Sequence, residues 1–268
     1  MSKRWLGLIV FVCIWLTGCT AQQQWENEVL VETSDRLTSS DVNAEWTVEE
    51  QESDETIRQA RVRLAVRTID GAIVDPFDLT HEKLLHLIIV SQDLSYFHHV
   101  HPSYVGNGVF EIDNDFPQGG KYRLIADFKP MGGDSMTKMT WVELSGEPAA
   151  ALPVAPDESL VDAADGVRAK LEVERLEARA GTTLTFELTD ERTGEPIADL
   201  EPYLGAIGHV VVLSEDGSRY VHVHAEDDQG AGPTASFEAT FPSEGIYKIW
   251  GQFQRGGRVF TVSYVVDV

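Results

Sequence analysis

Apolar and polar residues alternate with a period of two from about residue 44 to the end of the chain, a pattern typical of β-strands that bury one face. β-Branched and aromatic residues fill these segments, and Gly, Pro, Asp and Ser separate them. In the C-terminal part the pattern predicts strands near residues 168–175, 181–188, 208–215, 218–224, 234–241, 245–254 and 258–267. No convincing amphipathic helix interrupts them.

The chain contains an internal repeat. The segment HLIIVSQDLSYFHHVHP, which starts at His86, matches HVVVLSEDGSRYVHVHA, which starts at His209, an offset of 123 residues. Further on, DFPQGGKYRLIADF, which starts at Asp115, matches TFPSEGIYKIWGQF, which starts at Thr240, at an offset of 125 residues. A two-residue difference in the intervening loop accounts for the change of offset, and the two copies are expected to share one fold.

The repeat predicts how the chain is divided. We expect repeat 1 at residues 44–146 and repeat 2 at residues 167–268, joined by an Ala-, Pro- and acid-rich linker at 147–166. Residues 20–43 are polar and are expected to form a tether, although VLVET within them could add an edge strand. Seven short strands in about 100 residues predict an all-β chain with two tandem immunoglobulin-like β-sandwich domains, with a small barrel as the alternative.

The N-terminus predicts export and lipid anchoring. A short basic segment and an apolar run precede LTGC, which ends at Cys19. This layout is similar to the signal peptide and lipobox of bacterial lipoproteins, so we expect residues 1–19 to form the signal and Cys19 to carry the lipid. The protein is then extracytoplasmic and anchored to the cell membrane or outer membrane. The remaining cysteine, Cys13, lies within the signal, so the mature domains must rely on hydrophobic cores rather than disulfides.

The net charge of −23 points away from nucleic acid as a partner, because such a chain repels phosphate and attracts cations. The expected partners are the membrane, through the lipid, a metal ion and a protein of the envelope. No nucleophile elbow, phosphate-binding loop or dinucleotide glycine pattern is present, and the chain is not expected to be an enzyme.

The chain has eight histidines, and six of them fall at matching positions of the two repeats. These six are the candidate metal ligands: His86, His99 and His101 in repeat 1, and His209, His222 and His224 in repeat 2. The other two, His81 and His98, belong to repeat 1 alone.

Hairpin geometry predicts that each set of three shares one face of a sheet. Asp216-Gly217 is typical of a two-residue turn, and that turn would place His209 opposite His224, with His222 on the same side. A turn at the matching position of repeat 1, which lacks the glycine, would place His86 opposite His101. Opposed Cβ atoms lie about 4.5–5.5 Å apart, close enough for imidazoles to share a metal ion. The alternative is that the rings brace the sandwich through hydrogen bonds.

Apart from Met1, the methionines lie together in KPMGGDSMTKM. They are Met131, Met136 and Met139, and they are additional candidate ligands because thioethers favour Cu(I). Gap filling in the core is the alternative for them. The expected cofactor is a copper ion, with zinc as the other metal that imidazole accepts.

Both histidine segments resemble a known group of exported bacterial proteins. THEKLLHLIIVSQDLSYFHHVHP, from Thr80, and PYLGAIGHVVVLSEDGSRYVHVHA, from Pro202, look like the HEKxxHL…HVHP and PYLGAxGH…HVH signatures of the YtkA/FixH-like group of immunoglobulin-like domains. The resemblance covers about three quarters of the chain. It implies copper handling in the envelope, with the six matching histidines as ligands. Ala225 replaces the proline found at Pro102, a departure that removes no ligand.

Two functions follow from these patterns. The first is an extracytoplasmic, lipid-anchored metal-binding protein, most simply for copper, that acts as a carrier, buffer or accessory subunit. The alternative is an interaction or scaffold module of the envelope that binds no metal. Metal binding requires the three histidines of a repeat on one face, whereas a scaffold allows them to be buried and separately hydrogen-bonded.

Overall fold

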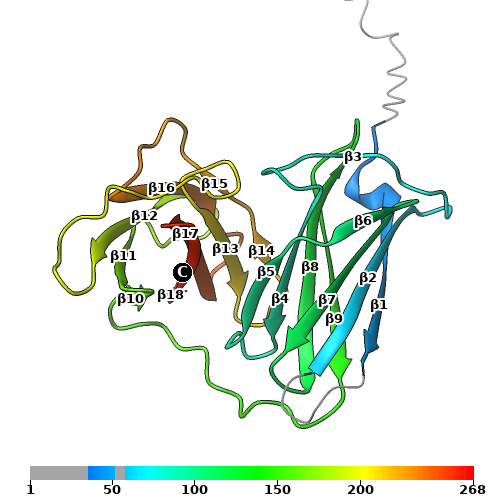
Figure 1. The fold of residues 1–268 in the computed structure, drawn as a ribbon, viewed down its shortest axis with the longest axis horizontal. Coiled ribbons are helices and arrows are strands. Elements are labelled where there is room, and N and C mark those ends of the chain that lie inside the picture. The colour runs from blue at the N-terminus through cyan, green and yellow to red at the C-terminus, as the bar shows by residue number, and fades with distance from the viewer. Residues whose placement is uncertain (1–35, 52–57) are drawn as a thin grey trace, which may run out of the picture. The chain divides into compact units, whose positions relative to one another are not determined.

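Strands make up nearly all regular structure in residues 36–51 and 58–268, the ranges that the computed structural model describes (Figure 1). The named strands pair antiparallel, and the all-β expectation is confirmed. Within these ranges no helix has the length and apolar character needed to cross a bilayer. The signal at residues 1–19, Cys19 and the segment VLVET lie outside the described residues.

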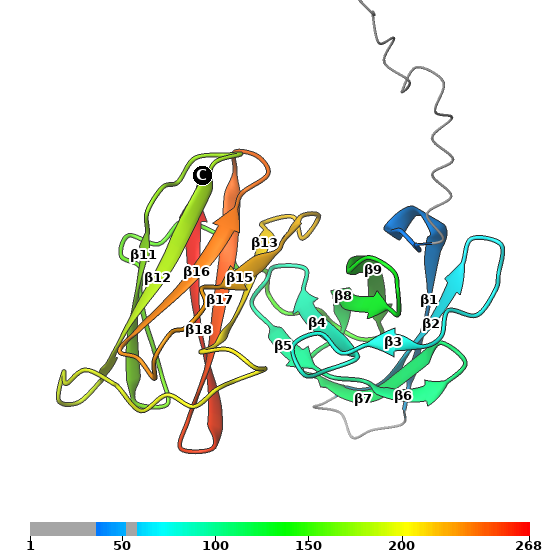
Figure 2. The same cartoon turned by 90° about the horizontal axis from the view of Figure 1, so that it is seen from above.

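Repeat 1 is a sandwich of two sheets, which Figure 2 shows nearly end-on. The first sheet has the order β1-β2-β7-β6 and the second has the order β3-β8-β4-β5, with β9 also paired to β8. The strands are β1 (Val42–Glu50), β2 (Arg58–Thr68), β3 (Phe77–Asp78), β4 (Leu85–Ser91), β5 (Phe97–Val100), β6 (Ser103–Gly106), β7 (Val109–Phe116), β8 (Gly120–Pro130) and β9 (Met136–Leu144).

Repeat 2 has the same arrangement. One sheet has the order β10-β11-β12-β16-β15 and the other has the order β14-β13-β17-β18. The strands are β10 (Val161–Ala164), β11 (Val167–Val173), β12 (Gly181–Asp190), β13 (His209–Ser214), β14 (Tyr220–Val221), β15 (Val223–Ala225), β16 (Thr234–Thr240), β17 (Ile246–Arg255) and β18 (Arg258–Asp267). The chain therefore contains two tandem immunoglobulin-like β-sandwiches.

Alternation along the strands builds a separate core in each repeat. In β12, Leu184, Phe186 and Leu188 are buried, whereas Glu187 between them is exposed. Because successive side chains of a strand point to opposite faces, each alternating strand supplies one row to its core. Phe186 and Phe237 belong to the core of repeat 2, and Phe110 and Phe116 to that of repeat 1.

Strands β4 and β13 depart from this alternation, and they dock the repeats. Leu87 and Ile89 of β4 enter the core of repeat 1, whereas Ile88 and Val90 face the other way and are equally buried. A third cluster covers that second face, and we call it the interface cluster. It comprises Ile88, Val90, Leu94, Ile125, Val211, Leu213 and Trp250. Residues of both repeats pack together there, within one compact unit.

Residues at matching positions of the two repeats meet across the docked surfaces. Lys248 Nζ of repeat 2 donates to Leu94 O of repeat 1 over 2.9 Å. At the matching positions, Arg123 of repeat 1 lies against Gly217 of repeat 2. Matching residues that make reciprocal contacts are the property of an isologous interface, usually found between two copies of one chain.

The boundaries differ from those expected. β1 begins at Val42, and Leu37 packs against the core of repeat 1, so the described end of the expected 20–43 tether belongs to the first sandwich. Strand β10 lies inside the expected 147–166 linker and pairs with β11. Both segments are polar or Ala-rich, and backbone pairing with a sheet edge orders β10 where its side chains give little hydrophobic signal.

Gly251 is expected to tolerate no side chain. A Cβ there would lie 2.7 Å from Cε1 of Phe186, which is fully buried. Gly251→Ala should lower the free energy of unfolding by about 1–3 kcal/mol through overpacking, measured as a lower midpoint of thermal unfolding by circular dichroism. Gly230→Ala is the matched control, because a Cβ at Gly230 meets nothing within 4 Å. Equal midpoints for the two variants would contradict this account of the packing.

Candidate metal centre

The β4–β5 hairpin of repeat 1 has the register that the sequence predicted. Ile88 pairs with His99 and Leu87 with Val100, which places His86 opposite His101, one residue beyond the end of β5. The turn bonds Ser91 N to Tyr96 O, so it holds this register without a glycine. His86, His99 and His101 therefore share one face, and their ligating atoms lie within 4.8 Å of one another. We call these three residues the triad.

Repeat 2 does not assemble the same three residues. Its turn also has the predicted register, with Val212 opposite Val221 and Leu213 opposite Tyr220. However, the strand breaks at His222, and β15 crosses to the other sheet, where His224 pairs with Glu238. The expected opposition of His209 and His224 is therefore wrong. The crossing follows from packing, because Val223 and Ala225 contact the core of repeat 2 from the opposite sheet.

His209 instead joins the triad across the docked surfaces. Its ring lies 4.8 Å from that of His99 and 5.7 Å from that of His86, centroid to centroid, in stacked orientation. His86 and His99 are buried, and His101 and His209 are partly buried. Four imidazoles from two repeats thus meet beside the interface cluster.

Hydrogen bonds determine which ring nitrogens of the triad carry protons. His86 Nε2 donates to Thr80 O over 2.8 Å, and His99 Nδ1 donates to Gln252 Oε1 over 2.7 Å. Gln252 Nε2 donates to Thr261 Oγ1, which turns Oε1 of the amide toward His99. A neutral imidazole has one N–H, so His86 Nδ1 and His99 Nε2 both present lone pairs.

These two lone pairs face each other over 3.1 Å. Facing lone pairs repel unless a proton or a metal ion lies between them. Two nitrogens bound to one tetrahedral ion by bonds of 2.0–2.1 Å lie about 3.3 Å apart, close to the observed separation. The third ring adds a nitrogen within 4.8 Å of the other ligating atoms. His101 Nε2 is buried and has no hydrogen-bond partner among the described residues.

Burial keeps these imidazoles neutral. It lowers the pKa of His86 and places that of His99 well below its usual value, with neighbouring histidines adding to the effect on both. Burial also lowers the pKa of His101 to about 4, and burial with four nearby histidines lowers that of His209 to about 3. A neutral imidazole is the form that binds metal, so the triad does not need to lose protons near pH 7.

Three further histidines, His81, His222 and His224, lie toward the surface, and we call them the outer histidines. The rings of His222 and His224 are 4.5 Å apart, and His222 Nδ1 lies 3.9 Å from Asp127 Oδ2. Burial raises the pKa of Asp127 to about 6. Asp127 and Gln252 occupy matching positions of the repeats, as do His222 and His99, so the two contacts are equivalent in the repeat.

The remaining candidates lie elsewhere. Met136 is buried in the core of repeat 1, Met131 is 59% exposed, and Met139 packs against the interface cluster. Met136 thus fills space in a core, the alternative that the sequence left open. His98, which was not a candidate, points to the other face of its strand, and its Nδ1 bonds Asn114 Oδ1 over 2.7 Å.

Sequence reasoning missed the contributions that cross between repeats. Gln252, which orients His99, and the stacked His209 belong to repeat 2, and a repeat-by-repeat interpretation does not bring them to the triad. One signal was present. The unbroken apolar run Leu87–Val90 is typical of a strand that is buried on both faces, which implies a second layer over the histidine face.

Comparison with solved structures finds weak likenesses. The chain is 15% identical to invasin, a bacterial integrin-binding protein, with a TM-score of 0.25. The match covers 85% of this chain and 39% of invasin. For InvD of Yersinia pseudotuberculosis the identity is 15% and the TM-score 0.27, over 87% of this chain and 58% of that one. For domains 4 and 5 of the S-layer protein SbsC the identity is 11% and the TM-score is 0.22, and the match covers 82% of this chain and 96% of that one. The chain thus spans 39% and 58% of the length of the first two.

Comparison with curated proteins gives no match. A family profile does match, and it does so twice, at residues 39–146 and 162–268. The two matches follow the two repeats and include the triad and the outer histidines. The resemblance to the YtkA/FixH-like group is not tested by this match and stays a prediction. The chain belongs to the family described as "Domain of unknown function (DUF8832)".

Proposed function

We propose that the triad of His86, His99 and His101 binds a copper ion, and that the protein is an extracytoplasmic, lipid-anchored copper carrier, buffer or accessory subunit. The observation that carries this proposal is the pair of facing lone pairs on His86 Nδ1 and His99 Nε2, 3.1 Å apart. The second ring nitrogen of each of these histidines, His86 Nε2 and His99 Nδ1, donates to an oxygen atom, as the second nitrogen of a metal-bound histidine usually does.

The donor set favours copper over the hard cations. Three neutral imidazole nitrogens suit Cu²⁺, Cu⁺ and Zn²⁺, whereas Ca²⁺ and Mg²⁺ prefer oxygen. Among divalent ions a nitrogen site of given geometry binds Cu²⁺ most tightly, which makes zinc the natural competitor. The thioether of Met136 lies in the core of repeat 1, so the proposal does not use it.

Repeat 2 has a supporting role in this proposal. Its Gln252 holds His99 in the required tautomer, and its His209 stacks on the triad. Loss of such a supporting partner typically weakens metal binding about 10- to 100-fold. The binding site is then complete only when the two repeats are docked.

The cellular part of the proposal is supported by the N-terminal sequence. The basic start, apolar run and LTGC ending at Cys19 are similar to a lipoprotein signal. An acidic chain held outside the cytoplasm would attract cations to the membrane surface.

Equilibrium dialysis of the purified chain against Cu⁺, Cu²⁺ and Zn²⁺ tests the proposal. We expect tight binding of copper that weakens about a hundredfold or more in His101→Ala. Docking should survive this change, because His101 Nε2 has no hydrogen-bond partner among the described residues. His98→Ala is the matched control, since His98 neighbours His99 but points away, and it should leave the affinity unchanged. Equal copper uptake by the wild type and His101→Ala would refute the ligand assignment.

The same observations favour a second function, a scaffold without metal. The His99–Gln252 hydrogen bond joins the two repeats, and His86 and His99 are buried, as a bracing role allows. A scaffold predicts that no variant changes metal uptake, whereas His99→Ala still lowers the thermal unfolding midpoint. Dialysis and thermal unfolding of the same variants therefore distinguish the two functions.

A further inference from the structure

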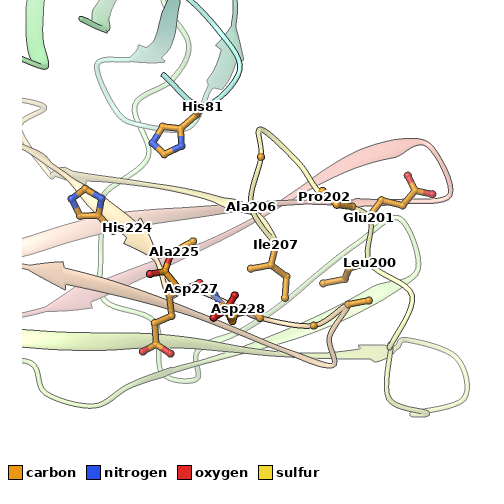
Figure 3. A pocket seen from close by; sticks show the side chains of 15 residues that line it. His81, Leu200, Glu201, Pro202, Ala206, Ile207, His224, Ala225, Asp227 and Asp228 are labelled. Carbon is orange, nitrogen blue, oxygen red and sulfur yellow. Dashed lines mark hydrogen bonds between the residues drawn. The ribbon is translucent and has the colours of Figure 1, made fainter. Parts of the chain in front are cut away.

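Two of the outer histidines, His81 and His224, line one cavity at the surface. Figure 3 shows His81, from the loop before β4, and His224, from β15, pointing toward the same space. The cavity has a volume of about 610 Å³. His81 and His224 are exposed, and the side chain of His222 is 44% exposed. These imidazoles are accessible to an ion in solution, in contrast to those of the triad.

Of the outer histidines, His81 makes ring contacts with His86 and His209. The rings of His222 and His224 lie 4.5 Å apart, and both lie close enough to His81 for their charges to interact. The His81 ring lies 5.8 Å from that of His209 and 6.0 Å from that of His86. The array then continues through His209 to His99, over 4.8 Å. His81 thus contacts the rings of His86 and His209 on one side and lies within electrostatic range of His222 and His224 on the other.

Acidic side chains surround the outer end of this array. Glu201, Glu226, Asp227 and Asp228 line the same cavity as His81 and His224. In a chain of net charge −23, a concave acidic surface raises the local concentration of cations and the rate at which they arrive. At the other end of the group, His222 lies beside the buried Asp127.

We propose that the outer histidines form a loading route, in which His224 and His222 capture a copper ion from solution and His81 passes it to the triad. This inference rests on the proposed function of the triad and adds how the ion reaches it. Each step exchanges one imidazole nitrogen, or a water molecule, for the next imidazole nitrogen, so the ion changes neither charge nor oxidation state.

A loading route and a binding site respond differently to mutation. A residue on the route lowers the barrier in both directions, so its loss slows binding and release alike and leaves the equilibrium affinity nearly unchanged. A ligand of the final site changes the affinity itself, chiefly through faster release. Rate and affinity measured on the same variants therefore separate the two roles.

Stopped-flow tryptophan fluorescence of the metal-free chain mixed with Cu²⁺ tests the route. The phase that reports loading of the triad is the one absent from His101→Ala. In the double variant His81→Asn, His224→Gln we expect this phase to slow by about tenfold or more, with a dissociation constant within about threefold of the wild type. Asn suits position 81, where φ is +47°. His98→Ala is the control and should load at the wild-type rate.

Each other outcome is decisive. An unchanged loading rate in the double variant would overturn the route while leaving the triad proposal intact. A loss of affinity as large as that of His101→Ala would also overturn it, since the outer histidines would then be ligands of the bound state. If the wild type binds no copper, the proposed function itself fails, and dialysis shows this before any rate is measured.

Discussion

Trp250→Ala is expected to undock the two repeats and to weaken copper binding, although Trp250 is not a proposed ligand. Its ring is 3% exposed in the interface cluster, stacks on Phe97 of repeat 1 at 4.8 Å, and lies 5.5 Å from Lys248 Nζ. Truncation of a buried tryptophan typically lowers stability by about 3–5 kcal/mol. Each repeat keeps its own core, so we expect calorimetry to show two transitions in the variant instead of one.

Copper affinity is the second readout of this variant. Undocking withdraws Gln252 and His209 from the triad, and we expect the affinity to fall about 10- to 100-fold. Phe241→Ala is the matched control, because Phe241 is fully buried in the core of repeat 2 and is not part of the interface cluster. It should lower stability by a comparable amount and leave the affinity of the folded protein unchanged. Equal affinity losses in the two variants would contradict the supporting role of docking.

Acidification from pH 7.5 to pH 5 is expected to lower the stability of the metal-free protein by at least about 3 kcal/mol, because the lowered pKa values of His99 and His86 add to the net effect of three other groups. The pKa values of His101 and His209 fall from 6.5 to about 4 and about 3 on folding. The unfolded chain therefore binds protons below pH 6.5 that the folded chain does not, and stability is lost as the pH falls toward those values. At pH 5 each residue contributes about 2 kcal/mol to the loss.

Asp127 opposes this effect. Its pKa rises from 3.8 to about 6 on folding, so the folded chain gains a proton first and stability increases as the pH falls through 6. At pH 5 this offsets the loss by about 1 kcal/mol. Denaturant unfolding at a series of pH values measures the net effect. His209→Asn should reduce the loss of stability between pH 7.5 and 5 by about 2 kcal/mol, and a loss identical to that of the wild type would show that His209 does not contribute to it.

Much of the fold follows from local pattern. The strands expected at 181–188, 234–241 and 258–267 match β12, β16 and β18 closely, because an alternating strand has only one way to bury its apolar face. Both hairpin registers are as expected, with Ser214 N donating to Arg219 O and Ser91 N donating to Tyr96 O at the ends of the turns. The triad follows from that register and from the period of the strand.

Longer-range packing accounts for what local pattern missed. The strand expected at 218–224 splits into β14 and β15, because contacts with the opposite sheet compete with the continued hairpin. The hairpin register alone would have kept His209 and His224 together. Neither the sheet change nor β10 has a local signature, since both depend on which edges and cores the rest of the chain presents.

By itself the sequence determined the duplicated sandwich, the two hairpins and the shared face of His86, His99 and His101, because each depends on residues near one another in the chain. Only the tertiary structure decided that the two histidine faces dock, that Gln252 and His209 complete the surroundings of the triad, and that His81, His222 and His224 lie toward the surface. The physical reason is that an imidazole's protonation and accessibility depend on its neighbours in space. Here those neighbours lie more than a hundred residues away, as His99 and Gln252 do, 153 residues apart.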